Sequence, residues 1–223
     1  MKPFPFHGCD EHFKPHIEKV LAGEYIIPWV PRYPPGAIVV DGGANVGAFT
    51  YWALTQLKAS YVHAIEPCEA IREHLVANLT DAGLLDKVTV IPCAITTTDE
   101  HTVKLYNGSE NSGMTSTNEA LAGQSEKFTI AHTIRAANLP ICHFLKMDIE
   151  GNEYEVIKEY KEYVCDPEFI SFEYHNAADR LNLDYLLYQD YYLGDMNPVA
   201  LDIASMNYVK RSTISVGDQN AMD

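Results

Sequence analysis

Two groups of residues in the chain have the types and spacing needed to bind a ligand and act on it. The first is Asp41–Gly47, which reads Asp-Gly-Gly-Ala-Asn-Val-Gly and follows the apolar residues 37–40. Glycines at such a point allow unusual backbone angles and let a ligand approach the main chain closely. A helix that begins near Gly47 would also offer unpaired N–H groups to an electronegative ligand group. The string predicts a nucleoside cofactor site at a strand-to-helix turn, in preference to a purely structural glycine turn.

Two classes of cofactor use a turn of this kind. Dinucleotide enzymes have Gly-x-Gly-x-x-Gly, with the phosphates on the helix end. This chain has Gly42-x-Ala44-x-x-Gly47 and a carboxylate, Asp41, directly before it. A carboxylate there would repel a pyrophosphate but suits an ammonium or sulfonium group. An NAD-dependent oxidoreductase therefore remains as the alternative, together with a catalytically inactive cofactor-binding module.

Glu66 is the next candidate, because it ends the second apolar run, 24 positions after Gly42. Doubly wound folds place an acid at this point to bind ribose hydroxyls. The competing interpretation is a solvated glutamate whose charge favours the start of the next helix. Residues 92–94 follow the third run, where an adenine edge would lie in such a fold. The spacing favours ribose binding by Glu66.

The second group lies at the ends of two later apolar runs, as pairs two positions apart. The pairs are Asp148 with Glu150, and Glu173 with His175. Side chains two apart on a strand share a face, and open α/β folds bind ligands at the carboxyl ends of their strands, so we expect these four to meet in one pocket. The cluster could supply a general base or a hydroxyl clamp, and a divalent metal is compatible with it but not expected. Alternatively, Glu150 caps the next helix and Glu173 pairs with Lys146.

The elements that position these residues follow from the hydrophobic pattern. Apolar runs predict strands, and helical spacing predicts helices between them, which gives a doubly wound α/β fold with a mostly parallel sheet. The expected strands are residues 37–41, 61–65, 88–91, 142–147 and 169–174, and the expected helices are residues 11–22, 47–57, 68–82, 152–163 and 178–190. Two last β pieces, 199–203 and 207–214, are expected to form an antiparallel edge pair.

The domain organisation predicted from this pattern is simple. Residues 1–36 form an N-terminal helix and lead-in, residues 37–217 form a single domain, and residues 218–223 form a tail. A segment rich in Thr, Ser, Asn and Gly, residues 93–131, is expected to be a hairpin-like β insertion with strands near 102–106 and 126–130. The polar loop 107–118 within it is a candidate lid.

Composition limits the classes of partner. The chain has 223 residues, with 16 Lys and Arg against 31 Asp and Glu, so the formal net charge is −15. So acidic a protein repels phosphate backbones, which disfavours nucleic acid as the main partner. The sequence holds no apolar run of the roughly 18 residues that a transmembrane helix needs, so we expect no membrane partner. The five scattered cysteines are typical of free thiols, and we expect a cytoplasmic protein.

The motifs together resemble a known family. The Asp41–Gly47 turn is similar to the first motif of class I S-adenosylmethionine-dependent methyltransferases. The string Lys146–Glu153 resembles the FkbM-type branch, as do residues 21–25, 111–113 and 173–175. This resemblance implies a seven-stranded methyltransferase sheet, S-adenosyl-L-methionine as cofactor, and methyl transfer to a hydroxyl of a small metabolite or sugar.

The resemblance also implies roles for individual residues. Asp41, Gly42, Gly43 and Asn45, with Gly47, would hold the methionyl part of the cofactor, Glu66 the ribose and Ala94 the adenine. Asp148 would lie near the transferred methyl group, and Asn111 and Ser112 would contact the substrate. The candidates for the general base are His175, Asp148 and Glu150, with Glu173 beside them. Gly42 stands where many relatives carry a bulkier aliphatic residue, which we expect a close backbone turn to tolerate.

Overall fold

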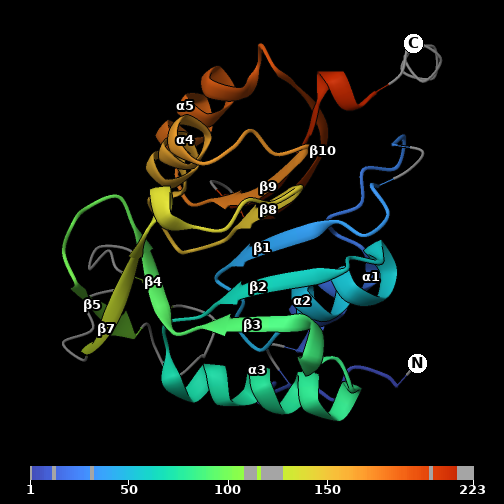
Figure 1. The fold of residues 1–223 in the computed structure, drawn as a ribbon, viewed down its shortest axis with the longest axis vertical. Helices are drawn as coiled ribbons and strands as arrows, with labels where there is room; N and C mark the ends of the chain where they lie inside the picture. The colour runs from blue at the N-terminus through green and yellow to red at the C-terminus, as the bar shows by residue number, and fades with distance from the viewer. Residues whose placement is uncertain are drawn as a thin grey trace.

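The computed structural model describes residues 2–11, 14–30, 33–107, 115–116, 128–200 and 203–214 (Figure 1). Its centre is a seven-stranded sheet with the strand order β10-β11-β9-β8-β1-β2-β3. The five strands from β9 to β3 are parallel, and β11 is antiparallel to both β9 and β10. The predicted α/β fold, mostly parallel with an antiparallel C-terminal pair, is confirmed.

The strands of this sheet are short and mostly buried. They are β1 (Ile38–Gly42), β2 (Tyr61–Ile65), β3 (Val88–Ile91), β8 (Phe144–Met147), β9 (Phe169–Tyr174), β10 (Tyr191–Ala200) and β11 (Ile203–Lys210). From β1 the sheet grows through β2 and β3 on one side and through β8 on the other. The carboxyl ends of β1, β2 and β8 therefore surround a topological switch point, where doubly wound sheets bind ligands.

Helices cover both faces of the sheet. They are α1 (Lys14–Ala22), α2 (Ala48–Trp52) continued by a π-helical turn (Ala53–Leu57), α3 (Glu69–Ala82), α4 (Glu153–Tyr163) and α5 (Ala177–Leu187), with 3₁₀ turns at Leu85–Lys87, Ala136–Asn138 and Arg211–Thr213. The last helix ends three residues before the predicted boundary at 190. None of the helices in the described segments has the length and apolar character that a bilayer crossing requires.

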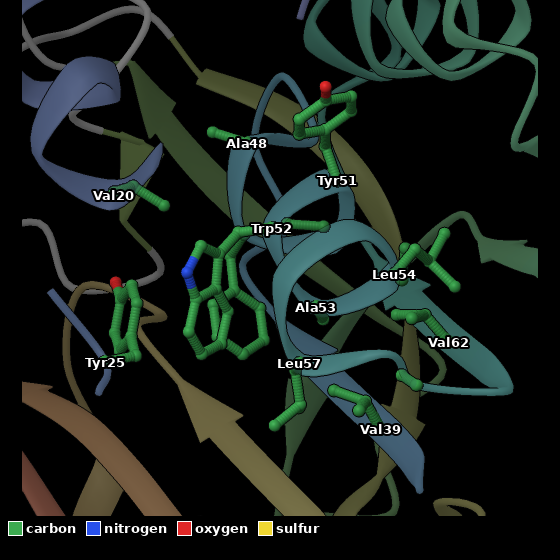
Figure 2. Close-up of a cluster of buried hydrophobic side chains, with 14 of the residues drawn as sticks. Val20, Tyr25, Val39, Ala48, Tyr51, Trp52, Ala53, Leu54, Leu57 and Val62 are labelled. Atoms are coloured by element: carbon green, nitrogen blue, oxygen red, sulfur yellow. The ribbon is translucent and has the colours of Figure 1, made fainter. Parts of the chain in front are cut away.

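Two hydrophobic cores lie on opposite faces of the sheet, because successive side chains of a strand point to opposite sides. Val39 packs with residues of α1, α2 and α3, whereas its neighbour Val40 packs with residues of α4 and α5. Figure 2 shows the first core, in which Trp52 lies beside Tyr25, a residue of the segment before the sheet. The N-terminal segment is thus anchored in the same core as β1.

A second, four-stranded sheet has the order β4-β7-β5-β6 and lies beyond the carboxyl ends of β1–β3 (Figure 1). Its strands are β4 (Cys93–Thr96), β5 (Thr102–Asn107), β6 (Thr115–Ser116) and β7 (Phe128–Arg135). β5 and β7 pair antiparallel, close to the two pieces predicted near 102–106 and 126–130. Asn111 and Ser112, the predicted substrate contacts, lie outside the described residues.

The edge pair has the predicted orientation but different boundaries. The structure places both strands earlier in the chain than the expected pieces 199–203 and 207–214: β10 spans ten residues instead of five, and β11 spans eight, as expected, but begins four residues earlier. β10 lacks the apolar pattern from which a strand is predicted. It is an edge strand, exposed along one side, and such strands tolerate proline and polar residues. It holds Pro198 and two register shifts, at Leu193/Asp195 and Pro198/Ala200.

Candidate functional site

The glycine turn after β1 is held by close backbone contacts. Gly43 has a φ of +71°, and a Cβ there would lie 1.8 Å from the carbonyl oxygen of Asp148. Gly43 N and Ala44 N both donate to the carbonyl oxygen of Ile65, at 3.1 and 3.0 Å. The turn is therefore clamped between the ends of β2 and β8. A Cβ on Gly42 would lie 2.5 Å from Met147 Sδ, which explains the small residue there.

The side chain of Asp41 points into the protein. It is fully buried, accepts a 2.7 Å hydrogen bond from Thr50 Oγ1, and places Oδ1 3.3 Å from Lys146 Nζ. Lys146 Nζ also donates to the carbonyl oxygens of Gly42 and Gly43, at 3.1 and 2.9 Å. Burial alone would lower the pKa of Lys146, but Asp41 and Asp148 outweigh it and keep the ammonium charged. In this arrangement Asp41 positions the turn through Lys146.

Glu66 follows β2 and is 5% exposed. Its Oε2 accepts a 2.9 Å hydrogen bond from Asn45 N, and its Oε1 accepts one of the same length from Cys68 N. Burial raises the pKa of Glu66 to about 7, although these bonds oppose the shift. The carboxylate therefore joins the glycine turn to the start of α3 and retains lone pairs that could accept from ligand hydroxyls.

A pocket opens at the switch point in front of Glu66. Its lining combines polar side chains with apolar ones, as small-molecule sites typically do. The lining residues are Gly43, Asn45, Ile65, Glu66, Pro67, Ile71, Cys93, Ala94, Ile95, Leu105, Asp148, Ile149 and Glu150. Ala94, Ile95 and Leu105 come from the second sheet, so the insertion supplies one wall. Five predicted cofactor residues thus share one pocket: Gly43, Asn45, Glu66, Ala94 and Asp148. Asp41, Gly42 and Gly47 are not among its lining residues.

The loop between β8 and α4 has an unusual backbone. Glu150, Gly151 and Asn152 have φ values of +59°, +116° and +73°, a region that non-glycine residues rarely adopt. Glu153, which is fully buried, compensates by accepting hydrogen bonds from Ile149 N and Gly151 N, at 3.1 and 3.0 Å. Glu153 therefore holds the loop that precedes α4, and Glu150, within that loop, lines the pocket.

The pairs predicted from the two strand ends come together around His175. Its Nε2 lies 3.2 Å from Glu150 Oε2 and 3.5 Å from Glu173 Oε1, and its Nδ1 lies 3.3 Å from Glu153 Oε1. Burial would lower the pKa of His175, but the three carboxylates outweigh it and raise the pKa well above its usual value. The imidazole is consequently protonated at neutral pH. Burial also raises the pKa of Glu150 and of Glu173.

The same cluster meets the geometric requirement for a divalent cation. Asp148, Glu173 and His175 each offer one ligand atom, and these atoms all lie within 4.8 Å of one another. His175 would first have to lose the proton that its three carboxylate neighbours stabilise.

Two residues of the N-terminal segment, Glu24 and Tyr25, lie at the site and were not predicted from the sequence. Ser205 Oγ lies 3.1 Å from Glu24 Oε1 and 3.4 Å from Glu173 Oε2, which adds Glu24 to the acidic cluster. A second, smaller pocket is lined by residues that include His16, Tyr25 and Asp148. Glu24 and Tyr25 belong to the string 21–25 that carries part of the family resemblance, but a loop residue ahead of the sheet has no pattern that reveals its contacts.

Comparisons with known proteins concern the family and the fold of the chain. The profile of the methyltransferase FkbM domain matches residues 41–202. Among curated proteins, none matches the chain. A structure of methyltransferase FkbM from Methylobacillus flagellatus KT is 20% identical, with a TM-score of 0.59 over 90% of this chain and 51% of that one. The chain thus spans about half the length of that protein.

Two further solved structures share the fold at lower identity. Precorrin-6y C5,15-methyltransferase from Geobacter metallireducens GS-15 is 11% identical, with a TM-score of 0.53 over 94% of this chain and 100% of that one. A provisionally assigned RNA methyltransferase from Pyrococcus horikoshii is 11% identical, with a TM-score of 0.51 over 94% and 90%. The profile match covers most of the chain, and the chain belongs to the FkbM methyltransferase family.

Proposed function

We propose that this protein transfers the methyl group of S-adenosyl-L-methionine to a hydroxyl of a small metabolite or sugar. One observation carries the proposal: the larger pocket, with Glu66 in its lining, and the smaller pocket beside the N-terminal segment share Gly43, Asn45 and Asp148. A cofactor in the first pocket and an acceptor in the second would therefore meet at Asp148. That arrangement suits a direct transfer between two bound molecules.

The residues of the larger pocket fit the parts of the cofactor. Glu66 would accept hydrogen bonds from the ribose hydroxyls, and Ala94 would lie against the adenine. The backbone of Gly43 and Asn45 would hold the methionyl end, with Asp41 and Lys146 fixing the turn from behind. When bound, S-adenosyl-L-methionine supplies an electrophilic methyl group on a sulfonium. Asp148, at the carboxyl end of β8, borders both pockets and would lie beside that group.

The acidic cluster would supply the general base. A methyl acceptor hydroxyl must lose its proton during transfer, and a base contributes about 10²–10⁴-fold to such a step. The protonated His175 is the weakest of the four candidates, because its three neighbouring carboxylates hold its proton. Asp148, Glu150 and Glu173 remain, and the raised pKa of Glu150 and of Glu173 brings them closer to neutral pH. In this scheme His175 positions the carboxylates.

The charge of the site favours a small, uncharged or cationic hydroxylated acceptor. Glu150, Glu153 and Glu173 surround the His175 imidazole, and Asp148 lies near it. The whole chain carries a net charge of −15. A phosphate-rich acceptor such as RNA would be repelled both by the carboxylates of the site and by the net negative charge of the chain. The likeness to an RNA methyltransferase concerns the fold alone, at 11% identity. We propose a small-molecule partner and, with five free thiols, a cytoplasmic location.

The position of Asp41 changes the case against an NAD-dependent oxidoreductase. Asp41 is buried against Lys146, so its charge no longer argues against a pyrophosphate. The membership in a methyltransferase family now favours S-adenosyl-L-methionine instead.

A transfer assay tests the proposal. The protein is incubated with S-adenosyl-L-methionine that carries a trideuterated methyl group and with a panel of sugars and hydroxylated metabolites, and products are identified by mass spectrometry. Labelled ether products from the wild type and from the exposed control Glu69→Gln, but not from Asp148→Asn, are expected. If the cofactor binds and no acceptor is labelled, the catalytically inactive module is the better account.

A further inference from the structure

Two cysteines far from the proposed site share one hydrogen-bonding partner. Cys142 precedes β8 and Cys165 follows α4, so both lie at the opposite end of these elements from Asp148 and Glu153. Tyr160 Oη lies 3.2 Å from Cys142 Sγ and 3.3 Å from Cys165 Sγ. These two distances limit the separation of the sulfurs to at most 6.5 Å. Cys165 Sγ also lies 3.6 Å from the carbonyl oxygen of Cys142.

The two thiols differ in environment. Cys142 is 5% exposed, and burial raises its pKa well above the usual value. Cys165 is half-buried, and hydrogen bonding to the Cys142 thiol lowers its pKa to about 5. A reactive cysteine is characteristically an accessible thiolate, and a sensor pair places a second, resolving thiol beside it. The structure supplies both members of such a pair.

We propose that Cys165 and Cys142 form a reversible disulfide when the protein meets a peroxide. The Cys165 thiolate attacks one peroxide oxygen and breaks the O–O bond, which gives a sulfenic acid at Cys165 and releases hydroxide. The Cys142 sulfur then attacks the Cys165 sulfur, the S–S bond forms, and the sulfenic oxygen leaves as water. Overall, two thiols and one hydrogen peroxide give one disulfide and two waters, and a dithiol reverses the change.

The disulfide would tie together the two ends of one structural unit. Residues 142–165 comprise β8, the loop with Asp148 and Glu150, and α4. A bond between the thiols would join the start of β8 to the end of α4 without touching either pocket. The proposal is thus independent of the reaction that the pockets catalyse, and its failure would leave that reaction untouched.

Peptide mapping tests the inference on the full-length, reduced protein. The protein is treated with hydrogen peroxide, free thiols are blocked with N-ethylmaleimide after unfolding, and the digest is analysed by mass spectrometry. We expect a cross-linked peptide pair containing Cys142 and Cys165, a mass loss of two hydrogens, three blocked thiols, and full reversal by dithiothreitol. Cys9→Ser, a half-buried control thiol, should leave the cross-link unchanged.

Variants separate the two roles. In Cys142→Ser, Cys165 should remain as a sulfenic acid that dimedone captures. In Cys165→Ser, oxidation of Cys142 should be at least tenfold slower than in the wild type. Five blocked thiols after peroxide treatment, a cross-link to a different cysteine, or over-oxidised Cys165 beside a free Cys142 thiol would each overturn the proposal. The mapping of the wild type alone decides between these outcomes if a variant does not fold.

Discussion

Replacing Glu66 by Gln should change stability and ligand affinity in ways that are separable. The carboxylate is 5% exposed, and its pKa is raised to about 7 from the value of 4.5 for an unperturbed glutamate. The folded chain therefore keeps the proton to a higher pH than the unfolded chain does. Because the unfolded state then binds fewer protons, stability falls as the pH rises from about 4.5 to 7.

The size of the effect follows from the two pKa values. Ionisation of Glu66 should destabilise the wild type by about 2–3 kcal/mol more at pH 8 than at pH 5. The amide introduced by Glu66→Gln does not ionise, so the variant loses this contribution. Relative to the wild type, Glu66→Gln should gain about 2–3 kcal/mol of unfolding free energy between pH 5 and pH 8.

Urea denaturation of the wild type and of Glu66→Gln at the two pH values measures this change, and Glu69→Gln, at an exposed position, serves as the control. The second readout is calorimetric titration with S-adenosylhomocysteine. Hydrogen bonds to a charged group are worth about 1.5–3 kcal/mol, so affinity at pH 8 should fall about 10- to 100-fold in Glu66→Gln. Unchanged affinity would refute the assignment of Glu66 to the ribose. A stability difference that does not vary with pH would refute the raised pKa.

Three further outcomes are expected. Gly43→Ala should lower the unfolding free energy by more than about 2 kcal/mol, because the new Cβ meets the carbonyl oxygen of Asp148. The control Gly83→Ala has the same φ of +71° but open space around it, and should lower the unfolding free energy by about 1 kcal/mol. Equal losses in urea denaturation would contradict the close approach of Gly43 to Asp148. Asp148→Asn should lower turnover at least about 100-fold while changing the S-adenosylhomocysteine affinity less than about threefold; equal losses in both would exclude its catalytic role. The His175 ring protons should not titrate between about pH 5.5 and 8.5 in NMR spectra, since the carboxylates hold the imidazolium; a midpoint near 6.5 would contradict this.

The convergence of the acidic residues was predictable because it depends on topology. Asp148 and Glu150 follow β8, whereas Glu173 lies near the end of β9 and His175 follows that strand. The two strands lie side by side and parallel, so their carboxyl ends had to meet. The same reasoning brought Glu66 to the glycine turn, since β1 and β2 are neighbours. Period-two spacing and the order of apolar runs are both visible in one sequence.

Other features depend on contacts that a single sequence does not display. Asp41 turns inward because Lys146, on the adjacent strand β8, gives it a buried partner. Glu24 reaches the cluster through Ser205, 181 positions along the chain. β10 was misplaced because an edge strand needs no hydrophobic alternation. Each of these outcomes is decided by a tertiary neighbour.

The central claim is that the pocket bordered by Gly43, Glu66 and Ala94 binds S-adenosyl-L-methionine. Its most direct test is a calorimetric titration of the purified protein with S-adenosylhomocysteine, S-adenosyl-L-methionine and NADH. We predict one site per chain for each of the first two, competition between them, and no binding of NADH. At 100 times its dissociation constant either ligand should stabilise the fold by about 2.7 kcal/mol. Binding of NADH alone, or of none of the three, would contradict the claim.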